Sequence, residues 1–283
     1  MGLPPNRPVP PHFIGRDAMA ALLNPLTELV ASAGAAILAF NRGRLRIDGK
    51  SDGSPVTEAD LAADRIIADG LARLAPHIPI VSEESSPPEL ASANTFFLID
   101  PLDGTKEFVA GRPEFTVNLA LVSDGTPILG IVAAPALGSI WRGVVGRGAE
   151  RLTMKGGNER AEAIHTEAIH TRSLPGSGQS WIAAVSRSHG DPTTEAFIAQ
   201  RPGAVRQMAG SAVKFVRVAE GTADIYPRLS PTREWDVAAG HALVTAAGGK
   251  ITDAQGADLR FGAGTMDFIV PAFIAWGDPR AAP

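Results

Sequence analysis

Two carboxylates three residues apart mark the stretch of the sequence that is best suited to chemistry. Asp100 and Asp103 follow an apolar run, and a turn there can aim both side chains and the carbonyl of Leu102 into one small volume. Hard oxygen ligands of this kind are those that Mg²⁺ prefers. Gly104 lets a ligand approach the backbone closely, and Thr105 offers a hydroxyl and an N–H at an expected helix start. The turn can therefore hold a metal ion and a phosphate, although an ordinary turn with Thr105 as a cap explains the same residues.

Other carboxylates also lie at the boundaries of expected elements. Thr57 suits the N-cap of a helix and Asp60 completes a capping box, so a structural role for Asp60 competes with a metal role. Glu83 follows a short apolar run that is typical of a strand. Asp236 fits the first turn of a helix, where the helix dipole alone favours an acid. Acids that recur at element ends indicate a shared cleft, which the sequence by itself does not place in space.

Three segments in the second half are further candidates for chemistry. One is Ser-Arg-Ser-His, which ends at His189, and another contains Ser211 and Lys214. The third is Tyr-Pro-Arg, which ends at Arg228. Each has an ordinary explanation, because Ser211 can cap a helix and Lys214 can be a solvated helix residue. The local pattern alone favours the structural explanation for each of them.

Composition excludes several classes of function. The chain has 283 residues, 45% hydrophobic and 20% charged, so it can bury a substantial core and disorder throughout is excluded. A formal net charge of -4 gives no global basic field, so we expect no nucleic acid polymer as a partner. The absence of cysteine excludes disulfides, thiolate zinc sites and cysteine nucleophiles, and it is compatible with the cytoplasm. The longest apolar stretch, residues 29–40, is too short for a transmembrane segment.

Hydrophobic periodicity divides the chain into an α+β first half and an α/β second half. In the first half we expect helices at residues 25–41 and 57–74, a strand at 78–81, a strand from 96 that Pro101 ends at Asp100, a hairpin from 115, and strands at 139–145 and 149–152. In the second half we expect strands at 181–186, 205–208 and 224–228, with helices at 192–200, from 211, and at 235–247. The predicted divisions are a flexible tail at 1–12, an N-terminal domain at 13–154, a connecting segment at 155–180 and a C-terminal domain at 181–283.

Taken together, these motifs resemble the magnesium-dependent, lithium-sensitive phosphomonoesterase superfamily that includes inositol monophosphatase and fructose-1,6-bisphosphatase. The resemblance rests on Asp-Pro-Leu-Asp-Gly-Thr at 100–105 and Trp-Asp-Val-Ala-Ala-Gly at 235–240, supported by Thr-Glu-Ala-Asp at 57–60 and Ser-Glu-Glu at 82–84. Within this superfamily the chain is most similar to the bacterial 3'(2'),5'-bisphosphate nucleotidases of sulfur assimilation. An inositol phosphatase usually lacks a cation at the position of Lys214. One departure is Ala212, where a second serine is often found.

The resemblance implies a layered α/β sandwich of the sugar-phosphatase type, with an antiparallel N-terminal sheet and a mixed C-terminal sheet flanked by helices. It implies two or three Mg²⁺ ions bound in the N-terminal domain and a substrate bound in the C-terminal domain. The implied metal ligands are Glu83, Asp100, the carbonyl of Leu102, Asp103 and Asp236, with Asp60 acting directly or through water. The implied catalytic residues are Glu83, Thr105 and Asp60, and the implied substrate-binding residues are Gly104, Thr105, His189, Ser211, Lys214, Arg228 and Asp236.

The resemblance also implies a reaction, which is hydrolysis of adenosine 3',5'-bisphosphate to AMP and phosphate by a metal-activated water, without a covalent intermediate and with inhibition by Li⁺. One alternative is a phosphatase for inositol phosphate or another small polyol phosphate. Another, from a different class, is a non-catalytic phosphate- or nucleotide-binding protein, which has no need for the complete set of acids. The sequence leaves open whether the protein is a monomer or a homodimer and whether it associates with a membrane surface.

Overall fold

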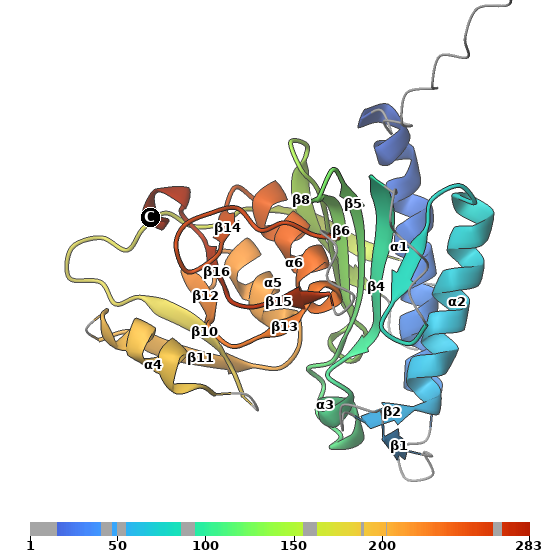
Figure 1. Ribbon diagram of the computed structural model, residues 1–283, viewed down its shortest axis with the longest axis horizontal. Coiled ribbons are helices and arrows are strands. Elements are labelled where there is room, and N and C mark those ends of the chain that lie inside the picture. Colours follow the sequence, from blue (N-terminus) through green and yellow to red (C-terminus); the bar gives the residue numbers. More distant parts are fainter. Residues whose placement is uncertain are drawn as a thin grey trace, which may run out of the picture.

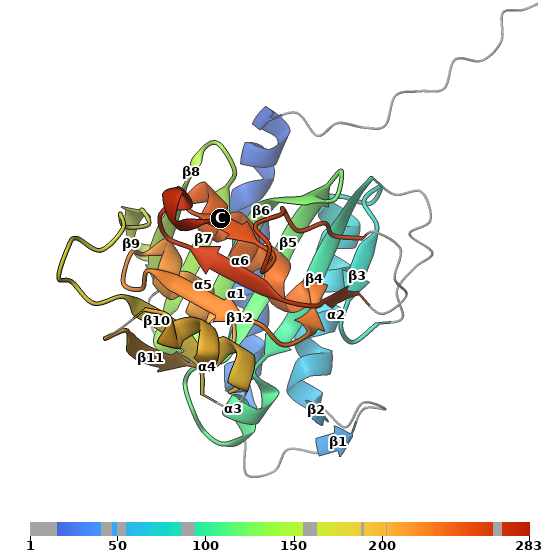
Figure 2. The ribbon, with the colours of Figure 1, turned by 60° about the vertical axis from the view of Figure 1, so that its left-hand side comes forward.

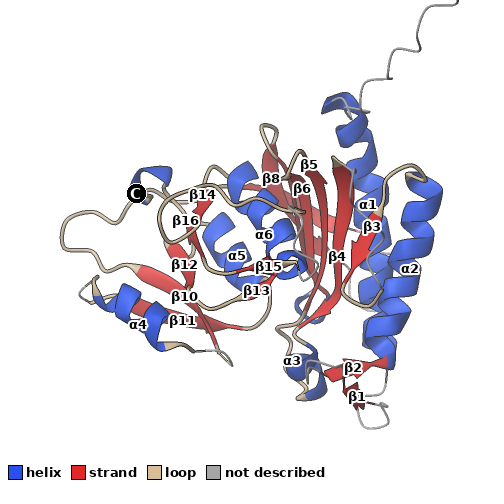
Figure 3. Cartoon of the chain, in the orientation of Figure 1, coloured by secondary structure: helices blue, strands red, loops and turns tan. Residues whose placement is uncertain are grey.

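The computed structural model describes residues 16–40, 47–49, 55–85, 94–154, 163–187, 190–201, 203–262 and 268–283. Within these residues, helices and sheets alternate in layers (Figures 1 and 3). The helices α1 (Arg16–Ala39) and α2 (Glu58–Leu74) cover the outer face of a seven-stranded sheet. The helices α5 (Val213–Ala219) and α6 (Glu234–Ala246) lie between this sheet and a five-stranded one, whose outer face carries α4 (Pro192–Ala199). This arrangement is the layered α/β sandwich that the sequence predicts.

The seven-stranded sheet has the strand order β3-β4-β5-β6-β7-β8-β9. Neighbouring strands are antiparallel except for β3 and β4, which are parallel. Alternation along β4 splits its side chains between two cores, because Phe97 and Ile99 pack with α1 and α2 whereas Phe96 and Leu98 pack with α5 and α6. The strands are β3 (Ile80–Ser82), β4 (Thr95–Asp103), β5 (Thr116–Ser123), β6 (Thr126–Ala134), β7 (Ser139–Val144), β8 (Gly148–Met154) and β9 (Ala163–Ile169).

The five-stranded sheet has the order β11-β10-β12-β16-β14 and is mixed, as predicted. Its strands are β10 (Ile182–Ser186), β11 (Val205–Ala209), β12 (Ile225–Arg228), β14 (Lys250–Thr252) and β16 (Phe273–Trp276). Figure 2 shows α4 lying across this sheet. Because β10 is parallel to both β11 and β12, the loops that follow these three strands meet at one edge of the sheet. Two short antiparallel pairs lie outside the sheets: β1 (Ile47–Gly49) with β2 (Pro55–Thr57), and β13 (Thr232–Arg233) with β15 (Ile269–Val270).

The predicted connecting segment contributes to the large sheet. Residues 163–169 form β9, which pairs with β8 from Ala149↔Ile169 to Met154↔Ala163. The large sheet therefore continues past residue 154, where the sequence analysis ends the first domain. The division of the chain into two domains stays a prediction.

The first helix is longer than the sequence analysis predicts, because α1 begins at Arg16 and contains Pro25. A proline inside a helix removes one backbone hydrogen bond, but Leu22, Leu26 and Val30 continue the same apolar stripe on both sides of it and pack against the core. The stretch Ala21–Ala39 is long and apolar enough to cross a membrane by length and composition alone, and 39% of it is buried. Its place against the large sheet is the ordinary one for a core helix.

The strand β4 does not end at Asp100 as predicted, but continues to Asp103. Asp100 pairs with Asn118 and Asp103 pairs with Thr116, so β4 has one more residue than β5 between these two pairs. Such a bulge accommodates Pro101, because the bulged position needs no N–H donor in the ladder. The irregular end of β4 leads directly into the short helix α3 (Thr105–Val109).

The helix α6 is packed closely on both of its sides. A Cβ at Gly130 of β6 would lie 2.2 Å from the carbonyl oxygen of Ala239, so the helix backbone rests on the sheet where a side chain is missing. On the other side, a Cβ at Gly240 would lie 2.3 Å from the ring of Phe215 in α5. These two glycines fix the position of α6 between the sheet and α5, and with it the position of the residues at its N-terminus.

We therefore predict that Gly130→Ala lowers the free energy of unfolding by about 1–3 kcal/mol, the usual range for overpacking a tight core. The matched control is Gly176→Ala, because a Cβ at Gly176 would meet its nearest neighbour at an ordinary 3.6 Å. Urea denaturation of both variants measures the effect, and equal midpoints for the two would contradict the proposed close approach of α6.

Candidate active site

Four carboxylates from both halves of the chain converge beside one cleft. Oxygen atoms of Glu83, Asp100 and Asp236 lie within 4.8 Å of one another. Glu83, Asp103 and Asp236 line a cleft of ≈ 220 Å³ that lies between the large sheet and the loops of the small one. Acids that the sequence places at separate element ends therefore share one volume.

The bulge in β4 holds two of these acids. The N–H of Leu102 donates to Asp100 Oδ1 at 3.1 Å, so the turn's own backbone orients this carboxylate. Asp103 Oδ2 accepts a hydrogen bond from Asn118 Nδ2 at 3.2 Å and lies 3.5 Å from Thr116 Oγ1, both on β5. In a regular strand, side chains three residues apart point to opposite faces of the sheet. The extra residue of the bulge removes this constraint for Asp100 and Asp103.

Behind this turn, Thr105 connects the cleft to α2. Gly104 adopts a φ of 90° and turns the chain from β4 into α3, a conformation that favours glycine. The Thr105 hydroxyl lies 3.0 Å from Asp60 Oδ1 and 3.2 Å from the carbonyl oxygen of Leu102, so its one proton has two available acceptors. The other oxygen of Asp60 accepts from the N–H and the hydroxyl of Thr57, at 2.9 and 2.5 Å. The capping role of Asp60 is present, and the same carboxylate reaches the cleft through Thr105.

Glu83 lies on the turn that follows β3. Its N–H donates to the carbonyl of Ile99 at 3.2 Å, next to the parallel pairing of β3 with β4. The same turn is tied to α2, because the hydroxyls of Ser82 and Ser85 lie 2.5 and 3.0 Å from the two carboxylate oxygens of Asp64. The sequence analysis missed Asp64, although its spacing of four residues from Asp60 places both acids on one helix face.

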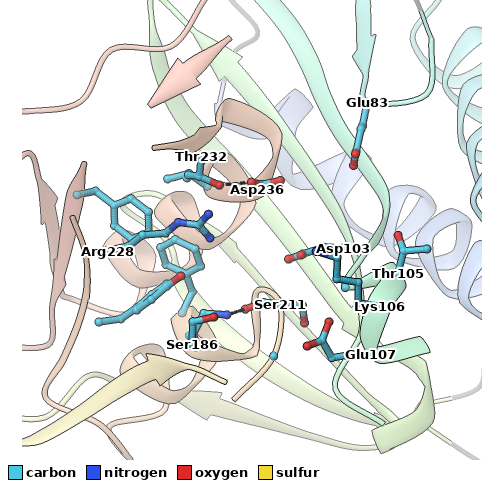
Figure 4. A pocket seen from close by; sticks show the side chains of 17 residues that line it. Glu83, Asp103, Thr105, Lys106, Glu107, Ser186, Ser211, Arg228, Thr232 and Asp236 are labelled. Atoms are coloured by element: carbon cyan, nitrogen blue, oxygen red, sulfur yellow. Dashed lines mark hydrogen bonds between the residues drawn. The ribbon is translucent and has the colours of Figure 1, made fainter. Parts of the chain in front are cut away.

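Asp236 comes from the second half of the chain, in the first turn of α6. Its Oδ2 accepts a hydrogen bond from the hydroxyl of Thr232 (Figure 4) and another from the N–H of Arg233 at 3.2 Å. These bonds orient the carboxylate at the helix N-terminus, where the dipole also favours a negative charge. The sequence analysis assigned no role to Thr232. Its position just before an expected helix was a signal that its hydroxyl could bind a residue of the first turn.

Burial and mutual repulsion disfavour the charged forms of these acids. Burial raises the pKa of Asp100 well above its usual value, and the charges of the three other carboxylates raise it further. Burial also raises the pKa of Asp103 to about 7, with a contribution from Asp236 that Lys214 opposes. Burial likewise raises the pKa of Asp60. A set of hard oxygen donors with unbalanced negative charge fits divalent cations, which would stabilise the ionised forms.

Lys214 lies in the same cleft and is nearly buried. Its side chain belongs to α5, the residue is 3% exposed, and its Nζ donates to the carbonyl of Ser211 at 2.6 Å. Burial lowers its pKa to about 8, while the negative charge of Asp103 acts in the opposite direction. The explanation of Lys214 as a solvated helix residue is therefore wrong.

Arg228 supplies a second cation, from the end of β12. Its Nη2 donates to the carbonyl of Pro231 at 3.3 Å, while its Nε is buried without a hydrogen-bond partner among the described residues. Figure 4 shows Arg228 across the cleft from Glu83 and Thr105. Arg228 therefore faces acids of the first half of the chain across the cleft.

The remaining predicted residues differ in outcome. Ser211 lines the cleft but does not cap α5, because the N-cap position is Ala212 and the Ser211 hydroxyl donates to the carbonyl of Glu114 at 3.2 Å. Gly104 lines the cleft at the start of α3. His189 lies outside the described residues. Ser186 and Tyr226, which begin two of the candidate segments, also line the cleft. The sequence analysis assigned no role to three further residues of the cleft wall: Lys106, Glu107 and Phe273.

Comparison with known proteins agrees with this geometry. A curated 3'(2'),5'-bisphosphate nucleotidase CysQ from Shigella flexneri is 38% identical over 244 residues, which cover 85% of this chain and 94% of that protein. The crystal structure of CysQ from Bacteroides thetaiotaomicron matches with a TM-score of 0.70 and 31% identity, covering 94% of this chain and 98% of that one. An inositol monophosphatase from Zymomonas mobilis matches with a TM-score of 0.72 and 28% identity, covering 94% and 96% of the two chains. The predicted resemblance to bacterial 3'(2'),5'-bisphosphate nucleotidases is confirmed.

The family to which the chain belongs is shown by a match over most of its length. The model of the inositol monophosphatase family matches residues 19–278, a span that contains both walls of the cleft. The family is metal-dependent, in agreement with the cluster formed by Glu83, Asp100 and Asp236. The chain therefore belongs to the inositol monophosphatase family.

Proposed function

We propose that this enzyme hydrolyses the 3'-phosphate of adenosine 3',5'-bisphosphate to give AMP and phosphate. The observation that carries the proposal is that two cations, Lys214 and Arg228, line the same cleft as the acids, with Arg228 across it from Glu83 and Thr105 (Figure 4). Hydrolysis of a simple phosphate ester needs the acids but not two further cations. A substrate with a second phosphate on the far side of a ribose would use the acids for one phosphate and the two cations for the other. The similarity of this chain to a 3'(2'),5'-bisphosphate nucleotidase supports the same choice of substrate.

The metal in the proposal is Mg²⁺, bound as two or three ions. Glu83, Asp100, Asp103, Asp236 and the carbonyl of Leu102 would hold these ions, and Asp60 would act directly or through water. When bound, the ions lower the pKa of a coordinated water and stabilise the phosphoryl and leaving oxygens during an in-line displacement. The hard oxygen donors and the raised pKa values of Asp100 and Asp103 support a divalent cation at this place.

The protein's own groups orient and deprotonate the attacking water. In the proposed arrangement the Thr105 hydroxyl donates to Asp60 Oδ1, which leaves its oxygen free to accept the proton of a water molecule. Asp60 is a suitable final acceptor, because burial raises its pKa above the usual value. Glu83, on the other side of the turn, accepts a second hydrogen bond from the same water. No side chain forms a covalent intermediate.

The far end of the cleft binds the rest of the nucleotide. Lys214 and Arg228 bind the 5'-phosphate, Lys214 as a point charge and Arg228 through its planar guanidinium. Ser211 contributes a hydroxyl to the same end, and His189 contacts the nucleoside. A nucleotide substrate of this kind agrees with a cytoplasmic location, which the absence of cysteine permits.

The family match also fits a phosphatase for inositol phosphate or another small polyol phosphate, because its members include inositol monophosphatases. A phosphate-release assay with Mg²⁺ separates the candidates, using adenosine 3',5'-bisphosphate, inositol 1-phosphate and glycerol 2-phosphate. We expect the nucleotide to have the highest kcat/KM. A preference for inositol 1-phosphate would favour the polyol phosphatase, and release from none of the three would favour a binding protein.

We predict that Asp100→Asn lowers kcat by about 100-fold or more while the protein stays folded. Loss of groups that only support metal ligands costs about 10–100-fold, so loss of a ligand charge should reach at least the upper end. The measurement is turnover of the bisphosphate at saturating Mg²⁺, with circular dichroism as the check on folding. Near-normal turnover would remove Asp100 from the metal site.

We also predict an effect of Asp103→Asn on stability that changes sign with metal. Folding raises the pKa of this carboxyl from 3.8 to about 7, so the metal-free folded state binds the proton more tightly and loses stability as pH rises through this interval. In EDTA the variant should therefore have a higher Tm than the wild type, by more at pH 8 than at pH 5. With saturating Mg²⁺ it should have the lower Tm, because it lacks a ligand. The control is Asp69→Asn, an exposed acid of α2. A lower Tm in EDTA at pH 8 would contradict the proposed repulsion.

For substrate choice, we predict that Lys214→Ala lowers kcat/KM for adenosine 3',5'-bisphosphate by roughly 10- to 150-fold, the size of a lost charge-assisted hydrogen bond. Arg228→Ala should behave similarly. Neither change should much affect glycerol 2-phosphate, which has no second phosphate. The control is Lys250→Ala, at a half-exposed lysine of β14 that pairs with Asp258 and does not line the cleft. Equal losses on both substrates would remove these two cations from the nucleotide end of the cleft.

A further inference from the structure

One residue of the first half, Glu114, contacts two loops of the second half next to the cleft. Its carboxylate forms an ion pair with Arg187, in the loop after β10. Its carbonyl oxygen accepts a hydrogen bond from the Ser211 hydroxyl at 3.2 Å, in the loop after β11. A Cβ at Gly210 would lie 2.6 Å from the same carbonyl, so the second loop can approach this closely only because Gly210 has no side chain. We call these four residues the Glu114 junction.

On the first-half side, the backbone of Glu114 is held in register with the metal-side acids. The next residue, Phe115, is fully buried and packs edge-to-face on Phe108 of α3, with ring centroids 5.1 Å apart. The residue after it, Thr116, pairs with Asp103 in the ladder of β4 and β5. A shift of the Glu114 carbonyl would therefore have to disturb the strand pair that carries Asp103.

On the second-half side, the junction reaches the cationic end of the cleft in one step. The carbonyl of Ser211 accepts the hydrogen bond from Lys214 Nζ at 2.6 Å, and Ser211 itself has a φ of 42°, which is unfavourable for a residue with a side chain. The N–H of Arg187 donates to the carbonyl of Ala209 at 3.3 Å, which ties the two loops to each other. Contacts that keep Ser211 in this conformation also keep Lys214 in its place.

We propose that Glu114 is a positioning residue that sets the distance between the metal-side acids and the cations at the far end of the cleft. It does not line the cleft itself, so it acts through Ser211 and Arg187. A fixed distance of this kind selects a substrate whose two phosphates are separated by a ribose. The inference rests on the proposed nucleotide specificity. It adds a residue of the first half to the two cations of the second half that determine this specificity.

The competing explanation is an ordinary half-exposed ion pair. The side chains of Arg187 and Glu114 are 33% and 16% exposed, and pairs with this exposure often contribute little to stability. Such a pair predicts kinetics that do not change when it is broken. A positioning role predicts a loss that depends on whether the substrate has a second phosphate.

The test is Glu114→Gln, which removes the charge and keeps the size and the backbone carbonyl. The matched control is Glu150→Gln, because Glu150 pairs with Arg142 at 2.6 Å with side chains 33% and 13% exposed, on β8 and β7. We expect Glu114→Gln to raise KM for adenosine 3',5'-bisphosphate by about tenfold, with kcat and the kcat/KM for glycerol 2-phosphate changed less than about twofold. Its Tm should differ from the wild type by no more than that of Glu150→Gln.

A double-mutant cycle with Arg187→Gln completes the test. If the ion pair acts as a unit, the double variant has the same KM for the bisphosphate as Glu114→Gln alone. Additive losses, equal losses on both substrates, or an unchanged KM would each overturn the positioning role. The wild-type assay separates this failure from that of the proposed function, because a wild-type enzyme without activity on the bisphosphate would overturn both.

Discussion

The rest of the structure depends on holding several buried and half-buried carboxylates together beside one cleft. Asp100 and Asp103 come from β4 and Asp236 comes from α6, so the two halves of the chain meet at a point of electrostatic repulsion. Apolar packing has to offset this repulsion in the metal-free protein. The close packing of α6, against Gly130 on one side and Phe215 on the other, supplies this packing within one turn of Asp236. Divalent cations at the same point turn the repulsion into binding.

The sequence predicts the parts of this structure that depend on neighbouring residues. The hairpin of β5 and β6 is set by Asp124 and Gly125, which both adopt the positive φ that a tight turn of this type requires. The capping box of Thr57 and Asp60 is likewise a local pattern, and it is present. The acids could be found in the sequence for the same reason, because each lies at the start or end of an element with a clear hydrophobic period. Local signals of this kind gave most element positions to within a few residues.

The parts that could not be predicted depend on contacts between distant residues. Nothing near Pro101 shows that Asp103 pairs with Thr116, so the strand was expected to end too early. Nothing near Lys214 shows its burial, which results from the sheet and helices that surround α5. The helix α1 passes through Pro25 because its packing outweighs the missing hydrogen bond, and β9 joins the large sheet although all of its residues except the last are exposed. In each case tertiary contacts override a local preference.

In the proposed function, the acids serve catalysis and the two cations serve substrate choice. The acids belong to the large sheet and its neighbouring helices, whereas Arg228 belongs to the small sheet and Lys214 to the helix packed against it. Arg228 has a buried Nε without a partner among the described residues, an unfavourable arrangement that a bound anion would relieve. Residues on the small sheet can therefore change without altering the acids, which is how one set of carboxylates can serve different phosphate esters. The proposed function still requires a fixed distance between the acids and the two cations, because a substrate with two phosphates would be bound by both groups at once.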